Sequence, residues 1–312
     1  MQDDTTAAVP VTPSPDVRRI NVTVACVLLC FGFLYYVAVA LVLVPWLSFS
    51  VPGLTNFTIL SFNTALALYC YLFCVFVDPG KVPQGWQPDQ EACSVQEVKK
   101  SGGARYCQKC QRWKPPRSHH CRVCRRCVLR MDHHCPWTNS CIGHANHRAF
   151  LHFLIYVSAA LLHTLGLIVA HALHTLQTSQ QRGVIRTGPQ SIPIHLREEG
   201  LQRVWLWAAM QTLAFALALP ITLGLVMLLV WHLQLTCHNK TTIEYQEGVT
   251  ASIQAAAGGA GLALHPYDLG LCANLHEAMG EFLLGWVLPP CSGTQGGTRY
   301  PTVWDERALG LS

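Results

Sequence analysis

Residues 107–141 read CQKCQRWKPPRSHHCRVCRRCVLRMDHHCPWTNSC and hold seven of the 15 cysteines in the chain. Two cysteines separated by two residues form a tight turn in which both thiolates can face one metal ion, as tetrahedral zinc requires. Such pairs are Cys107 with Cys110, Cys121 with Cys124, and Cys124 with Cys127, of which the last two share a sulfur. The spacing therefore predicts zinc binding and argues against a purely apolar role for these cysteines.

A count of possible ligands leaves one side chain over. Two closed four-coordinate zinc sites need eight ligands, whereas the seven cysteines and two of the four histidines make nine. Spacing leaves open whether His119 or His120, and whether His133 or His134, binds metal. It also leaves open which cysteine is spare, and a spare thiol between closed sites is free to react.

Cys135 has the neighbours that a reactive thiol needs. His133 lies two residues earlier and can take a proton, and Asp132 can fix the tautomer of that imidazole. A nearby imidazolium or zinc ion also lowers the pKa of a thiol. The run from Asp132 to Cys135 therefore indicates covalent catalysis. In the alternative interpretation Asp132 or His133 supports a zinc ligand through a hydrogen bond, and this role is compatible with catalysis.

The chain as a whole is more apolar than a soluble domain. Charged residues make up 12% of it and apolar residues 51%, with a net charge of +5, whereas about a quarter of a soluble domain is charged. Four stretches without Asp, Glu, Lys or Arg each exceed the roughly 20 residues that a helix needs to cross a bilayer. We therefore expect transmembrane helices at 20–44, 54–77, 149–176 and 204–235, rather than buried helices of a soluble protein.

Basic residues are concentrated between the second and third expected helices. Residues 78–148 carry 13 of the 22 Lys and Arg residues, and such an excess places a loop in the cytosol. Thiols stay reduced there, which favours metal binding or catalysis over disulfides. The other assignments follow from four spans: a disordered cytosolic N-terminus at 1–19, a lumenal or extracellular loop at 177–203, and a cytosolic C-terminal region at 236–312.

The cysteine and histidine pattern, continued by Asn146 and Phe150, resembles the cysteine-rich domain of the DHHC family of protein S-acyltransferases. Three further segments are similar to conserved motifs of that family and follow in the same order. They are Asp-Pro-Gly at 78–80, Thr-Thr-Ile-Glu at 241–244, and the segment 265–280. The cysteine-rich pattern is specific to the family, and the chain is similar to its plant and algal members.

The resemblance implies an all-α polytopic membrane protein. Four transmembrane helices would carry a small cytosolic zinc-bound domain, residues 105–150, between helices two and three. Two structural Zn²⁺ ions would be held there, the first by Cys107, Cys110, His120 and Cys127, and the second by Cys121, Cys124, His134 and Cys141. These ligand sets leave Cys135 free.

The resemblance also implies the reaction. A protein-cysteine S-palmitoyltransferase would move a long-chain acyl group from acyl-CoA to cysteines of cytosolic or membrane-associated proteins, through an acyl-enzyme on Cys135. His133 would act as base with Asp132 behind it, at an endomembrane (Golgi or ER) or plasma membrane. The implied contacts of acyl-CoA are Lys114, Arg117 and His119 with the phosphates, and Trp137 with the chain. Thr241 and Thr242 would brace Asp132, and Asn274 would pin the C-terminal segment.

Three other classes of function fit the sequence less well. A nucleic-acid-binding zinc module fits the basic residues, but not the membrane helices or the spare cysteine. A silent scaffold would not need Asp132, His133 and Cys135 together. A transporter is disfavoured because the spans contain no paired charges.

Overall fold

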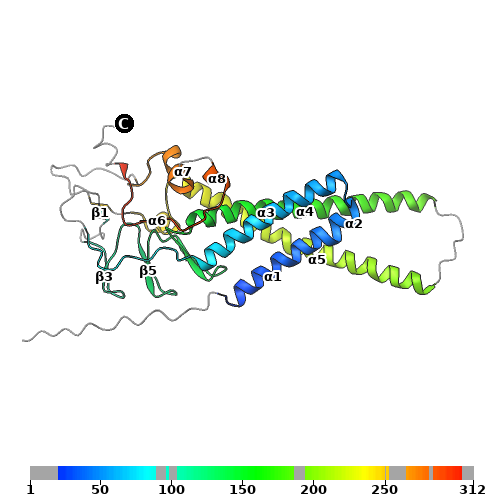
Figure 1. Ribbon diagram of the computed structural model, residues 1–312, viewed down its shortest axis with the longest axis horizontal. Helices are drawn as coiled ribbons and strands as arrows, with labels where there is room; N and C mark the ends of the chain where they lie inside the picture. Colours follow the sequence, from blue (N-terminus) through cyan, green and yellow to red (C-terminus); the bar gives the residue numbers. More distant parts are fainter. Residues whose placement is uncertain are drawn as a thin grey trace, which may run out of the picture.

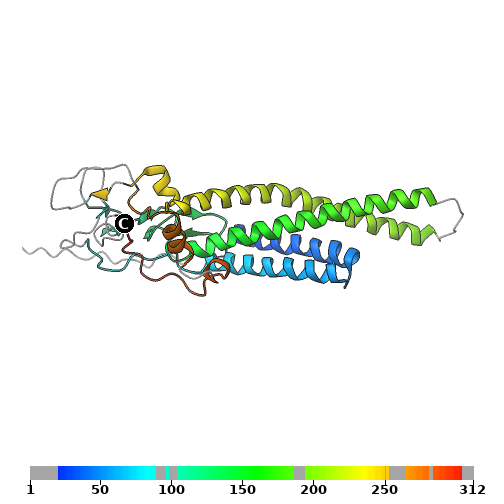
Figure 2. The same ribbon diagram turned by 90° about the horizontal axis from the view of Figure 1, so that it is seen from above.

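The computed structural model describes residues 20–88, 96–97, 104–185, 194–249, 251–252, 265–280 and 284–303. Long helices run side by side, and the β-hairpins and the short C-terminal helices gather at one end of them (Figures 1 and 2). Four helical stretches are long and apolar enough to cross a membrane: Val22–Leu47, Val51–Phe76, His147–Thr178 and Gln202–Cys237. The predicted fold class is confirmed, because four membrane helices flank a cysteine- and histidine-rich region between helices two and three.

The first span is made of three consecutive segments, α1 (Val22–Tyr36), the π-helical η1 (Val37–Leu43) and α2 (Val44–Leu47). The second span, α3 (Val51–Phe76), begins after only three residues, and Ser50 caps its first turn through the backbone N–H of Gly53. A Cβ at Gly53 would overlap the carbonyl oxygen of Ser48. Glycine at this position therefore permits the tight reversal, which is shorter than the sequence predicted.

The third and fourth spans extend well beyond the first two (Figure 2). They are α4 (His147–Ile185) and α5 (Ile194–Cys237). The stretches apolar enough to span end at Thr178 and begin again at Gln202, near the bounds of the loop expected at 177–203. Charged and polar residues such as Gln and Arg are good helix formers, so the helices continue past the apolar stretches.

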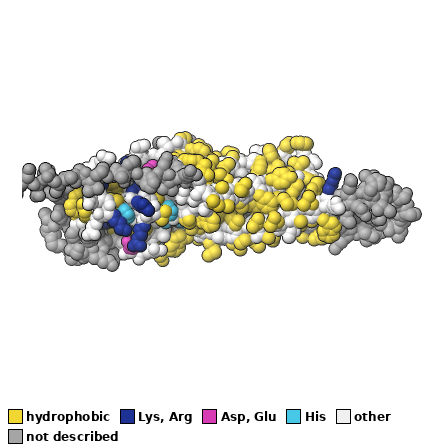
Figure 3. All heavy atoms as spheres, turned by 90° about the horizontal axis from the view of Figure 1, so that it is seen from below, with side chains coloured by type: hydrophobic (Ala, Val, Ile, Leu, Met, Phe, Trp, Pro, Cys, Tyr) yellow, Lys and Arg dark blue, Asp and Glu magenta, His cyan; other side chains and the backbone are white. Residues whose placement is uncertain are grey.

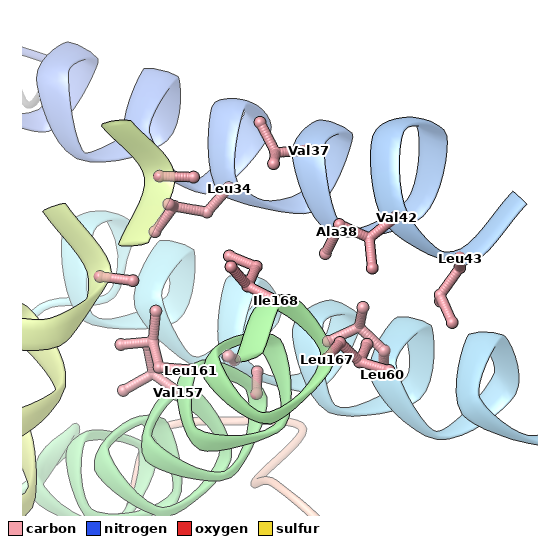
Figure 4. Close-up of a cluster of buried hydrophobic side chains, with 14 of the residues drawn as sticks. Leu34, Val37, Ala38, Val42, Leu43, Leu60, Val157, Leu161, Leu167 and Ile168 are labelled. Atoms are coloured by element: carbon pink, nitrogen blue, oxygen red, sulfur yellow. The ribbon is translucent and has the colours of Figure 1, made fainter. Parts of the chain in front are cut away.

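The main core lies where the four spans meet. Leu34, Val42 and Leu60 from the first two spans pack with Val157 and Ile168 from α4 (Figure 4). On the surface, hydrophobic side chains form a broad band along the helices, and Lys and Arg gather at the end that carries the hairpins (Figure 3). The band matches a multi-pass membrane protein, since lipid-facing side chains must be apolar.

Three antiparallel hairpins follow the second span. Their strands are β2 (Tyr106–Cys107) with β3 (Arg112–Trp113), β4 (His119–Cys121) with β5 (Arg126–Val128), and β6 (His133–Cys135) with β7 (Ser140–Ile142). The Asp-Pro-Gly segment anchors them to the end of α3. Asp78 forms a 2.7 Å ion pair with Arg126, and the carbonyl of Gly80 accepts from the backbone of Leu129.

The C-terminal region packs on the same end of the molecule (Figure 1). Its elements are α6 (Thr242–Glu247), β8 (Ala251–Ser252), which pairs with β1 (Gln96–Glu97), α7 (Leu271–Met279) and α8 (Leu284–Val287). Asn274 donates to the carbonyl of Cys237 at 2.7 Å. This bond confirms that Asn274 pins the C-terminal segment to the end of the fourth span.

Candidate active site

The three hairpins repeat one local structure at an interval of 14 residues. In each hairpin the cysteine that ends the first strand pairs with the fifth residue after it, as Cys107 pairs with Arg112. The equivalent pairs are Cys121 with Arg126 and Cys135 with Ser140. Each turn also contains a residue of positive φ at the same place, namely Gln111, Arg125 and Asn139. The second cysteine of the turn is Cys110 in the first hairpin and Cys124 in the second. In the third hairpin the same position holds Thr138 instead of a cysteine.

Each of the first two turns meets a histidine and a cysteine from the strands of the following hairpin. The resulting groups are Cys107, Cys110, His120 and Cys127, and Cys121, Cys124, His134 and Cys141, each with ligand atoms within 4.8 Å of one another. Their members agree with the two ligand sets that the resemblance implied.

The spacing within each group fits a tetrahedral metal. Sγ of Cys110 lies 3.1 Å from Nδ1 of His120 and 3.8 Å from Sγ of Cys127. In the second group, Sγ of Cys124 lies 3.5 Å from Nδ1 of His134 and 3.5 Å from Sγ of Cys141. Zinc bonds of 2.0–2.3 Å at tetrahedral angles separate neighbouring ligand atoms by about 3.6 Å. Both groups could therefore hold a metal ion.

The third turn is different, because no further hairpin follows it. Cys135 stands where a metal ligand stands in the other two hairpins, but Thr138 replaces the second cysteine, and α4 begins at His147. Cys135 is absent from both four-residue groups. The repeat thus explains how a thiol can be held as rigidly as a ligand and remain chemically free.

Asp132 and His133 lie beside this thiol. Nδ1 of His133 is 2.6 Å from Oδ2 of Asp132, which leaves Nε2 for a partner on the other side of the ring. Asp132 also accepts from the backbone N–H of Thr242 at 2.8 Å and from its hydroxyl at 2.9 Å. These bonds confirm the bracing role predicted for Thr242, and they fix the carboxylate from α6, the short helix that follows the fourth span.

The charges of the three groups reinforce one another. Burial would raise the pKa of Asp132, but the hydrogen bond from His133 and the nearby histidines hold it below its usual value. Burial would lower the pKa of His133, but Asp132 and Cys135 raise it to about 9. Burial would likewise raise the pKa of Cys135, yet His133 and Thr138 lower it. The site therefore favours a thiolate beside an imidazolium.

The reactive group lies at the end of the helix bundle. Cys135 is 5% exposed and packs with Phe73 and Cys74 of α3 and with Phe150 and Leu154 of α4. The ring of His133 meets Phe150 edge-on at 5.3 Å between centroids. His232 of α5 lies 5.9 Å from the same ring. Groups from three of the four spans thus surround the nucleophile.

The residues expected to contact acyl-CoA are in different environments. Trp137 is 63% exposed, while Lys114 and His119 are half-buried. Arg117 is completely buried, and its guanidinium donates to both carboxylate oxygens of Glu244 at 2.7 Å. Burial would raise the pKa of Glu244, but Arg117 lowers it to about 2. These bonds give Arg117 a structural function, and contact of any of the four residues with substrate stays a prediction.

Three features of the site were not predicted from the sequence. The 14-residue repeat was visible in the spacing of the cysteines and histidines, and it marks Thr138 as the replacement for a ligand. His232 is a histidine within a membrane span, and ionisable residues in spans are often functional. The pairing of Arg117 with Glu244 had no local signal, because the two residues are 127 positions apart.

Comparison with known proteins agrees with this geometry. The sequence model of one family, DHHC palmitoyltransferase, matches residues 100–249. The chain is 39% identical to "Probable protein S-acyltransferase 16" of Arabidopsis thaliana, over 92% of this chain and 94% of that protein. It is 35% identical to "Probable protein S-acyltransferase 15" of the same plant, over 83% and 92%. It is 34% identical to "Palmitoyltransferase PFA4" of Mycosarcoma maydis, over 90% and 60%.

Proposed function

Because this chain belongs to the DHHC palmitoyltransferase family, we propose that it S-acylates proteins through an acyl-enzyme formed on Cys135. The observation that carries the proposal is the third hairpin, in which Cys135 has the position of a ligand but belongs to none of the groups of described residues that could hold a metal ion. Asp132 and His133 at 2.6 Å complete a nucleophile, a base and an orienting acid.

Acylation of the enzyme is the first step. The thiolate of Cys135 attacks the carbonyl carbon of a long-chain acyl-CoA, and the bond between that carbon and the sulfur of coenzyme A breaks. His133, charged because its pKa is raised to about 9, gives its proton to the departing thiolate. Asp132 keeps the ring oriented throughout, since two bonds from Thr242 hold its carboxylate.

Transfer to the substrate protein is the second step. Neutral His133 takes the proton from a cysteine thiol of the substrate, whose sulfur attacks the thioester carbonyl. The bond from the acyl group to Cys135 breaks, and the enzyme returns to its thiolate and imidazolium form. The two half-reactions share one site, so ping-pong kinetics are expected.

Two zinc ions would have a structural role in this enzyme. The ligand sets Cys107, Cys110, His120 and Cys127, and Cys121, Cys124, His134 and Cys141, would each close one tetrahedral site. Bound zinc would supply folding free energy to hairpins whose buried clusters are small and include cysteines of the ligand sets. The hairpins in turn hold Cys135 against the ends of α3 and α4.

The position of Cys135 suits an amphipathic acyl donor. Its neighbours Phe73, Phe150 and Leu154 provide an apolar surface that continues into the helix bundle. Burial of the fatty chain there contributes about 0.8 kcal/mol per methylene. Lys114 and His119, on the basic hairpin region, are the proposed contacts for the phosphates of coenzyme A, with Trp137 beside the chain.

The orientation in the membrane follows from the charge distribution. Lys and Arg gather at the hairpin end of the molecule (Figure 3), and cytosolic segments carry such an excess. The active site would therefore face the cytosol, where acyl-CoA and the cysteines of membrane-associated substrates are available. An endomembrane or the plasma membrane is the proposed location.

The deciding experiment is incubation of the purified protein with a labelled long-chain acyl-CoA. Wild type should take up label as a hydroxylamine-sensitive thioester, and Cys135→Ser should take up none. Cys237→Ser is the matched control, because Cys237 is the last residue of α5 and lies outside the groups that could hold a metal ion. Wild-type protein that holds about two zinc ions but takes no label would refute the proposal and favour a scaffold function.

A further inference from the structure

A cavity whose lining does not include Cys135 lies between the start of α4, α7 and the C-terminal segment 294–301. Its volume is about 330 Å³. Three arginines line it, Arg130, Arg148 and Arg299, and Glu277 is the one acid among the described residues that line it. The lining therefore has an excess of positive charge.

Arg130 has hydrogen-bonding capacity that the described residues do not use. Its side chain is buried, with the residue only 8% exposed, and Nη2 donates to Asn239 at 2.8 Å. Nη1 lies 3.6 Å from Glu277, but that carboxylate is also 3.8 Å from Arg117. Nε is buried and has no acceptor among the described residues. A buried guanidinium N–H without a partner is costly, so an additional acceptor would stabilise Arg130.

Arg148 repeats this pattern on the other side of the cavity. Its Nη2 donates to the carbonyl of Gly285 at 2.7 Å, and its Nε is buried without an acceptor among the described residues. Arg299 lines the cavity and is exposed to solvent. The cavity also lies at the N-terminus of α4, which begins at His147, and the dipole of a long helix adds positive potential there.

These features fit one ligand chemistry. Guanidinium groups bind phosphate oxygens through paired N–H donors, and a buried site with low dielectric strengthens such bonds. We propose that this cavity binds a phosphate group, carried by a lipid head group or by a soluble phosphate compound. Arg130 follows the second hairpin, Arg148 belongs to α4, and Arg299 belongs to the C-terminal segment. A phosphate bound to all three would hold that segment against the hairpins.

The test uses the full chain and two probes. Pyrophosphate is titrated calorimetrically into protein in phosphatidylcholine nanodiscs, and a fluorescent short-chain phosphatidylinositol 4-phosphate is titrated into protein in detergent. Wild type should bind at least one of the probes. Arg299→Gln should weaken that binding about tenfold, the effect of losing one charged contact. Arg122→Gln, an exposed arginine of the hairpin region outside the cavity, should bind like wild type.

The outcomes also identify the source of the phosphate. Binding of pyrophosphate supports a soluble compound, and its displacement by coenzyme A would assign the phosphate to the acyl donor. Binding of the lipid probe alone supports a head group. The proposal is overturned if wild type binds neither probe, or if Arg299→Gln binds as tightly as wild type. Acylation of Cys135 is measured separately, so either result leaves the proposed reaction intact.

Discussion

Thr242 donates two hydrogen bonds to Asp132, from its backbone N–H to Oδ1 at 2.8 Å and from its hydroxyl to Oδ2 at 2.9 Å. Thr242 is the first residue of α6, and Thr241 caps that helix in a reciprocal pair with Glu244. Because Glu244 also binds the buried Arg117, the same short helix positions the acid of the active site and anchors the hairpins.

Thr242→Val should slow acyl-enzyme formation. The substitution keeps the backbone N–H but removes the hydroxyl, and a hydrogen bond to a charged group contributes about 1.5–3 kcal/mol. Loss of about 1.4 kcal/mol from the transition state corresponds to a tenfold slower reaction. Single-turnover labelling with acyl-CoA measures the rate, and Thr242→Ser should stay near wild type. A wild-type rate for the valine variant would show that the backbone bond alone orients Asp132.

Asp132→Asn should move the reactivity of Cys135 to higher pH. The carboxylate raises the pKa of His133 to about 9, so its replacement by a neutral amide lowers that pKa. Less imidazolium is then present at neutral pH, and the pKa of Cys135 rises because the thiolate loses its counter-charge. The midpoint of the pH profile should increase by about one unit.

The measurement is the rate at which iodoacetamide alkylates the peptide that contains Cys135, followed by mass spectrometry from pH 6 to 10. The zinc content of each sample is the control, since it shows that the hairpins remain folded. If the midpoint is unchanged in Asp132→Asn and zinc is retained, the Asp132 carboxylate is not what keeps the imidazole of His133 protonated.

Much of this site was predictable from the sequence because its chemistry is local. The metal groups come from cysteines and histidines within 35 consecutive residues, and the helices come from charge-free stretches. Proximity in the chain also placed Asp132 and His133 beside Cys135.

Interactions between distant residues could not be predicted in this way. His232 reaches the active site only because α5 packs beside α4, and Arg117 meets Glu244 only after the C-terminal region folds back. Arg117, a basic side chain expected to contact phosphate, is completely buried and pairs with Glu244. Its charge is balanced by a partner that no local pattern reveals.

Arg117→Lys should destabilise the protein without weakening acyl-CoA binding. Lysine cannot form the two parallel bonds that the guanidinium makes with Glu244. Disruption of a buried ion pair costs roughly 3 kcal/mol, so thermal unfolding should occur at a clearly lower temperature. Lys114→Gln, at a half-buried position, should show the opposite pattern, with wild-type stability and a raised KM for acyl-CoA. A raised KM in folded Arg117→Lys would restore its predicted contact with substrate.

Thr138→Cys should allow Cys135, the nucleophile, to bind zinc. The turns that contain Cys107 and Cys110, and Cys121 and Cys124, have the same geometry as the third turn, where Thr138 takes the place of the second cysteine. A second thiol there would allow the pair to chelate zinc, since thiolate is a strong zinc ligand. Added zinc should therefore lower acyl labelling of this variant at least tenfold. Thr138→Ser, which keeps the hydroxyl that lowers the pKa of Cys135, should be labelled like wild type and be insensitive to zinc. If Thr138→Cys is labelled normally in the presence of zinc, the absence of a second thiol is not what leaves Cys135 free to react.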